Sequence, residues 1–353
     1  MHKLDRYIVS TVSSAILVVM LIVLSLDFLF AYIGEMDELR GRYQSFEAFL
    51  YVCSTLPRRI YDYLPLGAFM GCLVGLGALA KNSELTVLRA AGVSTIRIVY
   101  AAMKSAFVVV FFGLLLGEFV APLTEKIAQS QKAVAQGAES DIGSHQGLWH
   151  REGHVFMHFN VVESNGVLHG VMLQFYDDDR ALLRTVFAGR ALYQRGGWLL
   201  ESVIETRFEN GRTNVEEYVK LAWDTDLTPS LLDVLIVKPD NLSISGLYAY
   251  AEYLGDQGLS SAEYMVSFWK KLLQPVSTLM LVLVAISFVF GPLRSVTMGF
   301  RVFLGVVVGL SFKYVQDLLG PMSLVFGFNP VYATLIPILV CMCLGMMLLL
   351  RSR

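Results

Sequence analysis

Charged residues are scarce in this chain. Only 16% of its 353 residues are Asp, Glu, Lys or Arg, whereas a typical soluble domain has about 25%. The net charge of −2 excludes a strongly basic nucleic-acid-binding protein, so we expect no nucleic-acid partner. The charges cluster in a few segments and leave long stretches almost bare. Apolar runs of about 18 or more residues can cross a bilayer core of about 30 Å, so the sequence predicts several membrane-spanning helices.

Cysteines and catalytic motifs are equally sparse. All four cysteines lie in apolar runs or at their edges, at Cys53, Cys72, Cys341 and Cys343. This placement argues against a disulfide framework. The chain contains no G-x-x-x-x-G-K-[ST] loop for nucleotide phosphates, no H-E-x-x-H and no G-x-S-x-G. We therefore expect a non-catalytic protein with no cofactor of its own.

Six apolar runs divide the chain. They cover about residues 8–33, 47–80, 95–121, 264–290, 300–319 and 330–350. The first run is too long for a signal peptide, so we expect a retained spanning helix. The first half of the second run contains Pro57, Pro65 and three charged residues, which favours an interfacial position for that half. Pro122 is expected to close the third run.

Short-loop Lys and Arg residues give the orientation. With the N-terminus inside, the inner segments hold nine of them: Lys3, Arg6, Lys81, Arg89, Arg97, Arg294, Arg301, Arg351 and Arg353. The outer loop at residues 320–329 holds none, and the outer loop after the first helix offsets Arg40 and Arg42 with three acidic residues. Both termini are therefore expected in the cytoplasm, and the polar section of about 140 residues after the third run on the outside.

That polar section has the two-residue period of β-strands. Strands are expected at residues 155–162, 167–176, 182–193 and 198–208, separated by turn sequences such as ESNG and ENGR. A polar helix at 243–255 leads back to the membrane. The predicted fold is an α-helical membrane protein with six transmembrane helices, arranged 3+3 around an inserted antiparallel β-sandwich or jelly-roll-like domain. The domains are residues 1–121, 122–262 and 263–353.

A short charged island, KNSELTVLRAAGVS at 81–94, separates the second and third runs. It predicts a cytoplasmic helix at about residues 83–91, capped by Asn82 or Ser83 and ended by Gly92. A helix of about ten residues is marginal on its own in water. Leu85 and Leu88 form an apolar stripe, which Val87 could extend, with Glu84 and Arg89 at its flanks. The amphipathic pattern alone leaves two hypotheses open, a helix on the lipid surface or a helix docked into a partner.

Six segments in order give the chain a resemblance to a known family. They are LDRYI at 4–8, NSELTVLRAAGVS at 82–94, GEFVAP at 117–122, QGLW at 146–149, LSISGL at 242–247 and FGPLRSVTMGFR at 290–301. Together they resemble the LptF/LptG permeases of the bacterial lipopolysaccharide exporter, an ABC transporter, and the G-type subunit in particular. The resemblance covers essentially the whole chain, including the 3+3 layout of helices.

The resemblance implies a bacterial inner-membrane complex with lipopolysaccharide as its substrate. The implied partners are a related F-type permease in a heterodimer, a cytoplasmic ATPase dimer that uses ATP and Mg, a single-span LptC-like periplasmic subunit and a periplasmic bridge protein. By the same match the helix at 83–91 is the coupling helix that inserts into the ATPase. The residues expected at that contact are Glu84, Leu85, Leu88 and Arg89. An alternative function is an ATPase-driven mechanical or signalling protein that transports no lipid.

Lipopolysaccharide carries phosphates and carboxylates, which Arg and Lys bind through charge-assisted hydrogen bonds. Candidates for a cationic rim at the outer interface are Arg40, Arg42, Arg58, Lys132, Lys270 and Lys271, with Arg59 beside them. The resemblance favours Arg40 and Lys132 for the phosphorylated head. It also places a lateral gate between the first run of one permease subunit and the fifth run of its partner. The alternative is that these side chains only extend from helix ends toward the interface.

Three charges lie deeper in the predicted spans, at Asp27, Lys313 and Asp317. Lys313 and Asp317 are four residues apart on one helix face, so we expect them to pair. Asp27 could face a partner subunit or a cavity, and the sequence does not choose. His150, His154 and His158 suggest a metal site, but a strand does not bring a four-residue spacing together, so we expect none.

Overall fold

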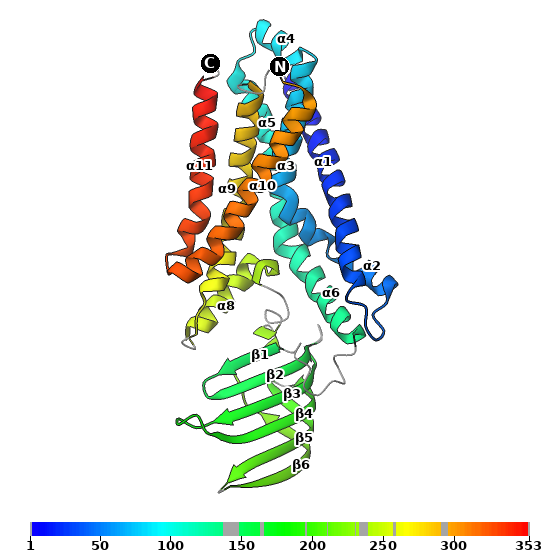
Figure 1. Cartoon of the computed structure of the whole chain (residues 1–353), viewed down its shortest axis with the longest axis vertical. Helices are drawn as coiled ribbons and strands as arrows, with labels where there is room; N and C mark the ends of the chain where they lie inside the picture. The colour runs from blue at the N-terminus through cyan, green and yellow to red at the C-terminus, as the bar shows by residue number, and fades with distance from the viewer. Residues whose placement is uncertain are drawn as a thin grey trace.

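The computed structural model describes most of the chain (Figure 1). The described residues are 2–136, 148–162, 166–194, 196–209, 211–229, 231–232, 239–256, 259–290 and 296–351. The two termini and the short helix α4 (Glu84–Ala90) lie at one end of a helical bundle, and a β-sheet lies beyond the other end. Arg294 and Arg353, which contributed to the predicted orientation, are outside the described residues.

Six helices in the described ranges are long and apolar enough to cross a membrane, as predicted. Their bounds are α1 (His2–Met36), α3 (Leu56–Lys81), α5 (Thr95–Leu115), α9 (Ala262–Phe290), α10 (Met298–Phe326) and α11 (Pro330–Arg351). Helix α3 occupies the centre and contacts α1, α5, α9 and α10. Its buried core residues include Phe69, Cys72 and Leu76, none of which is measurably exposed.

Small residues allow α3 and α1 to approach closely. Gly67, Gly71 and Gly75 repeat every four residues along the face of α3 that meets α1. A Cβ at Gly71 would lie 2.4 Å from the Cα of Ile16, so no larger residue fits. Helices in membranes depend on such small residues, because close backbone approach gains the van der Waals contact that holds them together.

The second apolar run is two helices rather than one. Helix α2 (Ser45–Ser54) begins with a capping box between Gln44 and Glu47 and ends at Thr55, where α3 starts. The charged first half of that run is therefore the first two turns of α3 itself, with Arg58, Arg59 and Asp62 on them.

The sequence predicted that the third run stops at Pro122, but the helix continues beyond that residue. A π-helical turn, Leu116–Val120, joins α5 to α6 (Ala121–Ala135), and Pro122 sits in the first turn of α6. At that position the missing N–H of proline needs no acceptor, and the π turn absorbs the change in helical register. The helix therefore continues toward the sheet and places Glu125 and Lys132 beyond the apolar run.

In the described part of the polar section, six strands form one antiparallel sheet in sequential order. The strands are β1 (Leu148–Glu152), β2 (Val155–Val162), β3 (Leu168–Tyr176), β4 (Leu182–Gln194), β5 (Gly197–Glu209) and β6 (Arg212–Trp223). The four predicted strands correspond to β2 through β5. The outermost strands β1 and β6 were not predicted. Phe159, Trp198 and Trp223 pack together on the covered face of the sheet.

The chain returns from the sheet to the bundle through a 3-10 turn, η2 (Pro239–Asn241), and α8 (Ile244–Asp256), which matches the predicted polar helix. Leu247, Tyr250 and Leu254 of α8 form a small apolar cluster that Tyr264 and Phe268 at the start of α9 complete.

Candidate functional site

Helix α4 protrudes from the end of the bundle that carries the termini (Figure 1). Its start has an unusual backbone, because Ser83 adopts a left-handed conformation with φ 60° and makes no side-chain cap. Its end follows the predicted signal. Gly92 has φ +85°, and the Val93 N–H donates to the Leu88 carbonyl at 3.0 Å. This is the C-terminal glycine arrangement that stops a helix.

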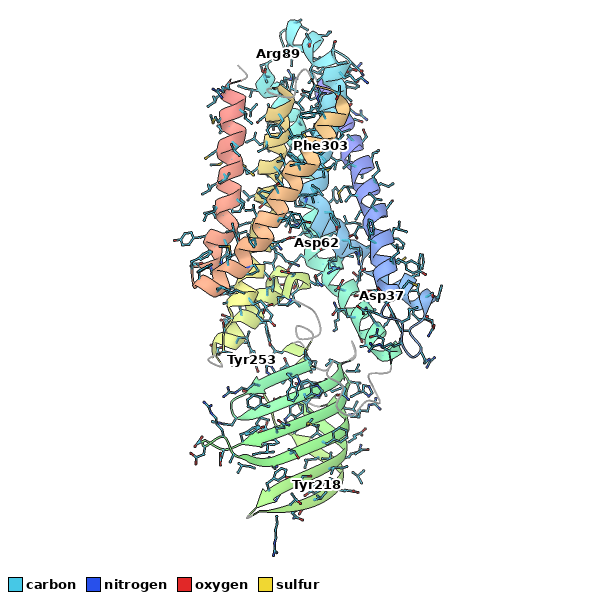
Figure 2. The ribbon with its side chains drawn as sticks, viewed as in Figure 1. Asp37, Asp62, Arg89, Tyr218, Tyr253 and Phe303 are labelled. Carbon is cyan, nitrogen blue, oxygen red and sulfur yellow. The ribbon has the colours of Figure 1, made fainter. Side chains whose placement is uncertain are left out.

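The apolar side chains of α4 do not all face outward: two face the chain's own core and one is exposed. Leu85 is only 5% exposed and, with Leu88, packs on the chain's own apolar core. Glu84 accepts a hydrogen bond from the Tyr7 hydroxyl at 2.8 Å, which ties α4 to α1. The outward residues are Val87, which is 64% exposed, and Arg89, at the tip in Figure 2. A partner would therefore contact Val87 and Arg89, while Leu85 and Leu88 hold the helix in place.

At the opposite end, Lys132 of α6 is surrounded by acceptors. Its Nζ lies 2.7 Å from both Glu35 and Glu38, and 4.6 Å from the centre of the Tyr51 ring. The Tyr43 hydroxyl donates to Glu35 at 2.8 Å. Burial and this carboxylate raise the pKa of Tyr43, so its phenol keeps its proton. Lys132 thus fastens α6 to the segment between α1 and α2 and is neutralised within the chain.

Arg40 and Arg42 are presented by the segment that Lys132 fastens. Arg40 forms an isolated β-bridge with Tyr43, and the Arg42 N–H donates to the carbonyl of Ala135 at 2.9 Å. Gly41 between them has φ +56° and comes so close to Ala135 that a Cβ would be 3.2 Å from its carbonyl oxygen. Both guanidinium side chains are exposed, and in the described ranges no ion pair holds either of them.

Asp27 is satisfied inside the subunit. Its carboxylate accepts from Arg59 at 2.7 Å and from the Tyr63 hydroxyl at 2.8 Å. All three groups belong to α1 and α3. Asp27 thus pairs with α3 of its own subunit, a partner that the sequence did not indicate.

Arg58 also has internal partners. Its Nε lies 3.4 Å from the Glu125 carboxylate, which is only 1% exposed, and its Nη1 donates to the Asn241 side chain at 3.1 Å. The amide of Asn241 in turn donates to Glu125 at 3.2 Å. These contacts join α3, α6 and η2, so Arg58 is a structural link rather than a free lipid ligand.

The predicted pair between Lys313 and Asp317 is wrong. Asp317 accepts from Lys270 of α9 at 2.8 Å, and the Lys313 ammonium instead lies 5.2 Å from the centre of the Tyr63 ring. A long-range contact replaced the local one because α9 places a second lysine against α10. Lys271 is 6% exposed and donates to the carbonyl of Leu242.

A cavity of about 700 Å³ opens among these groups, at the sheet end of the bundle. Helices α3, α9, α10 and α11 and the turn η2 line it. Its lining includes Asp62, Lys270, Lys313 and Asp317 together with apolar residues such as Phe312. The sheet side of the bundle thus has a polar interior within helices that are otherwise apolar.

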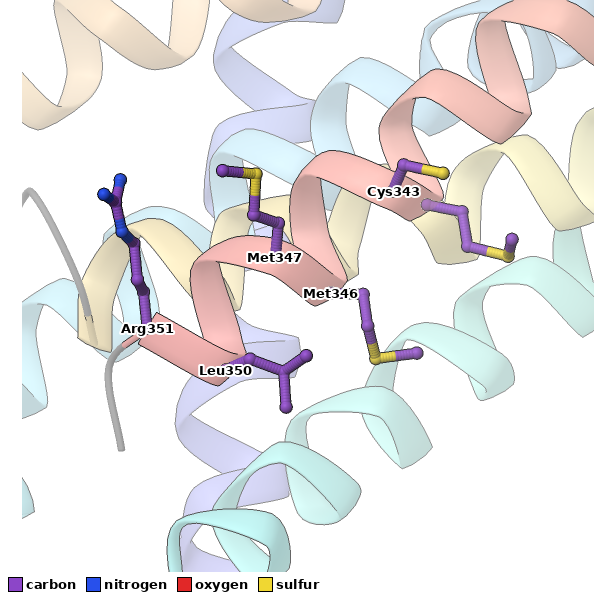
Figure 3. Close-up of a pocket in the computed structure, with 6 residues that line it drawn as sticks. Cys343, Met346, Met347, Leu350 and Arg351 are labelled. Atoms are coloured by element: carbon purple, nitrogen blue, oxygen red, sulfur yellow. The ribbon is translucent and has the colours of Figure 1, made fainter.

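A second hollow lies on the outer side of α11, near the C-terminus (Figure 3). Met342, Met346, Met347 and Leu350 line it, and Arg351 is its only charged residue. Without opposing polar groups it resembles the lipid-facing side of a spanning helix, and we assign no polar ligand to it.

The three histidines have separate surroundings on the sheet. His150 lies 3.3 Å from the Tyr253 hydroxyl of α8, His158 packs on the Trp149 ring, and His154 lies 3.5 Å from Asp178. Among the described residues, no group of three or more His, Cys, Asp or Glu side chains could hold a metal ion.

Comparison with known proteins decides the family. The profile of the lipopolysaccharide export system permease LptF/LptG matches residues 6–351. The chain is 33% identical over 353 residues to the lipopolysaccharide export system permease protein LptG of Escherichia coli strain K12, covering 99% of this chain and 98% of that protein. The chain belongs to the LptF/LptG permease family. The LptG protein of Haemophilus influenzae is 32% identical, over 100% of this chain and 99% of its own length.

Membership in the LptF/LptG family makes the chain a multi-pass transmembrane transport subunit rather than an enzyme. It agrees with the six spanning helices and the inserted antiparallel sheet. The residues that sequence reasoning missed in this LptF/LptG permease are Glu125, Asn241, Tyr7 and Tyr63, all partners of predicted residues. Each lies more than thirty residues from the group it contacts, so local spacing held no signal for them.

Proposed function

We propose that this permease is one subunit of an ATP-driven exporter that extracts lipopolysaccharide from the outer leaflet of the bacterial inner membrane. In this proposal it passes the lipid to a periplasmic bridge toward the outer membrane. The observation that carries the proposal is the match to the lipopolysaccharide export permease family from residue 6 to residue 351. The relatives named LptG align over almost the full length of both chains, so the proposal applies to the whole molecule.

The orientation is inferred from charge. The end of the bundle with both termini carries Lys3, Arg6, Lys81, Arg89 and Arg97, whereas the described loop between α10 and α11 carries no Lys or Arg. Positive charge favours the cytoplasmic side of a membrane. The α4 end is therefore cytoplasmic in our proposal, and the sheet is periplasmic.

We infer that α4 is the contact for a cytoplasmic ATPase dimer. Motion of such a partner would reach the bundle through three attachments of α4: its direct continuation from α3, the hydrogen bond from Tyr7 to Glu84 and the packing of Leu85. A rigid-body displacement of a docked helix is an established way to transmit such a change.

The lipid contact that we favour is Arg40 with Arg42. Arg58, Lys132 and Lys270 are paired with carboxylates within the chain, and Lys271 is buried and donates to a backbone carbonyl. Beside the two arginines, α1 exposes a strip of large apolar residues, among them Leu26, Leu29, Phe30 and Ile33. A cationic rim next to an apolar surface suits a phosphorylated lipid with acyl chains.

The exposed sides of α1 and α10 are also the surfaces that we assign to a related F-type permease. Phe300, Phe303 and Leu318 of α10 are exposed, as are the α1 residues named above. An LptC-like single-span subunit and a periplasmic bridge protein complete the proposed complex, and ATP and Mg are bound only by the ATPase.

Co-purification tests this proposal. The tagged full-length chain, solubilised in mild detergent, should bring down a cytoplasmic ATPase, a second six-helix permease and lipopolysaccharide, identified by mass spectrometry. Arg40→Gln with Arg42→Gln should reduce the recovered lipopolysaccharide while the ATPase remains. Recovery of an ATPase without lipopolysaccharide in every preparation would instead favour a mechanical or signalling protein.

A sharper test addresses α4. Val87→Asp should reduce ATPase recovery at least about tenfold, because it buries a charge in an apolar contact, and should leave the melting temperature of the permease unchanged. Leu85→Ala is the matched variant, because it should destabilise the permease by about 2–4 kcal/mol through its own core. Normal ATPase binding by a folded Val87→Asp protein would contradict the assignment of α4.

A further inference from the structure

The cavity among α3, α9, α10 and α11 differs chemically from a site for an anionic lipid. Its acidic and basic lining residues are equal in number. Two of them neutralise each other across the cavity, since Lys270 and Asp317 are 2.8 Å apart. A polyanionic head group would find no excess of positive charge here.

Three charged lining residues, Asp62, Glu263 and Lys313, have no hydrogen-bond or ion-pair partner among the described residues, and Glu263 lies in the first turn of α9. Asp62 of α3 is exposed in the cavity wall and, in the described parts of the chain, accepts no hydrogen bond. Lys313 of α10 lies over the Tyr63 ring and has no carboxylate partner among those same residues. Ionised groups at membrane depth are costly unless something compensates them, and they mark binding sites more often than inert surface.

An unpaired acid, Asp62, and an unpaired base, Lys313, on neighbouring helices of the same cavity match a ligand that carries both signs. We propose that this cavity binds a zwitterionic phospholipid whose head group has a primary ammonium, with its phosphate on Lys313 and its ammonium on Asp62. A primary ammonium can donate hydrogen bonds to the Asp62 carboxylate, whereas a quaternary one has no N–H to donate. The lipid is a constituent of the surrounding bilayer and is distinct from the exported lipid of the proposed function.

The remainder of the lining suits acyl chains. Leu66, Phe312 and Leu324 contribute apolar surface, and the volume of about 700 Å³ is enough for a head group with the first part of its chains. Ligand pockets in proteins commonly have volumes of about 300–1,000 Å³. The ion pair of Lys270 with Asp317 joins α9 to α10 beside this cavity, and Gly309 of α10 packs closely against Leu66 of α3.

Lipid titration by native mass spectrometry tests the proposal on the wild-type permease complex. The delipidated complex is titrated separately with phosphatidylethanolamine, phosphatidylcholine and phosphatidylglycerol of identical acyl chains. Phosphatidylethanolamine should bind about tenfold more tightly than either of the others, which is the effect of one charge-assisted hydrogen bond. Equal binding of the three lipids would overturn the proposal without any variant being made.

Variants then assign the head group. Asp62→Asn should lower the affinity for phosphatidylethanolamine about tenfold and abolish the preference over phosphatidylglycerol, whereas Lys313→Gln should weaken both lipids. Lys313→Arg keeps the phosphate contact and should bind as the wild type does. Wild-type selectivity in both Asp62→Asn and Lys313→Gln would place the lipid elsewhere.

The matched control is Arg42→Gln, which lies outside the cavity and should leave phosphatidylethanolamine binding unchanged. The same control separates this proposal from the proposed function, because loss of lipopolysaccharide in Arg42→Gln tests export alone. Displacement of bound phosphatidylethanolamine by lipopolysaccharide, one for one, would make the cavity part of the export route and would refute a separate site.

Discussion

At the scale of single residues, the basic side chains near the sheet end serve two purposes. Lys132, Arg58, Arg59 and Lys270 each meet a carboxylate of their own chain at 2.7–3.4 Å. Arg40 and Arg42 do not, and they project from the segment that Lys132 fastens. Sequence spacing does not distinguish the paired basic residues from the unpaired ones, because the carboxylates that pair with them lie in distant parts of the sequence.

Replacing Lys132 should therefore act on stability. Lys132→Met leaves Glu35, whose side chain is only 13% exposed, without its counter-ion. We expect a loss of about 2–3 kcal/mol in the free energy of unfolding, since removing one member of a largely buried pair strands the other charge. Thermal unfolding of the purified permease measures this.

The matched variant for Lys132 is Arg42→Met, an equal loss of charge on the segment that Lys132 contacts. It should change the free energy of unfolding by no more than about 0.5 kcal/mol, as exposed positions without partners generally do. If the two variants destabilise the permease equally, Lys132 is not the fastener that its contacts indicate.

At the scale of secondary-structure elements, β1 connects the sheet to α8 through a titratable side chain. His150 of β1 lies against Tyr253 of α8, and burial lowers the pKa of His150, although Glu152 partly offsets this. Burial also lowers the pKa of His158 on β2. Both imidazoles are thus held in the neutral form by the folded sheet.

The folded permease should lose stability in mild acid. A histidine in the unfolded chain has a pKa of about 6.5. Below that pH the unfolded chain therefore binds more protons than the folded chain does. Stability is fully present above about pH 6.5 and falls toward the lower folded pKa, by at most about 1.4 kcal/mol per pH unit for each histidine. Unfolding measured from pH 7.5 to 5 should show this slope.

His150→Gln with His158→Gln should flatten that slope. Glu205 does not interfere with this comparison. Its hydrogen bond from Arg207 lowers its pKa, so its contribution to stability is lost only at more acidic pH, below about 4.3. An unchanged slope in the double variant would assign the acid sensitivity to other groups.

The elements that sequence patterns predicted correctly are those defined by their own period. Six apolar runs gave six spanning helices, and alternating residues gave β2 through β5. The patterns missed β6, whose alternation is weak because it is an edge strand with polar residues on both faces, as in Glu216 and Glu217. The continuation through Pro122 was missed because proline predicts the end of a helix. The π turn before it has no sequence signature of its own.

The candidate site was less predictable than the fold. Leu85 and Leu88 were identified as the apolar residues of α4, but their spacing does not say whether they face a partner or the chain's own core. Leu85 faces the core. Likewise, Asp317 pairs with Lys270, which is 47 positions away in the sequence, and not with Lys313, which is four positions away. Helix packing, which periodicity does not encode, decides both.

At the scale of the whole molecule, the return segment from the sheet is fixed to three helices. Asn241 contacts Arg58 of α3 and Glu125 of α6, and Ser267 of α9 donates to Asp240 at 2.8 Å. Glu118 accepts from the backbone N–H groups of Ile244 and Ser245 at the start of α8. The sheet is therefore held by fixed contacts to the ends of α3, α6 and α9.

A double-mutant cycle tests the strength of this attachment. Arg58→Gln and Glu125→Gln should each cost about 2–4 kcal/mol of unfolding free energy, because each leaves a buried charge alone. The combined variant should cost clearly less than their sum, since two amides can bond to each other and to Asn241. Additive losses measured by chemical unfolding would mean that the two groups do not interact.

The sequential order of the six strands has a consequence for biosynthesis. Each strand pairs with the one made immediately before it, so the hairpins can close as the chain is made, without waiting for distant segments. The contacts of Asp240 and Leu242 are different, because their partners Ser267 and Lys271 on α9 are translated afterwards. The sheet can therefore be complete while α9 is still to be inserted, and the contacts of α9 with Asp240 and Leu242 are the last attachments of the return segment to form.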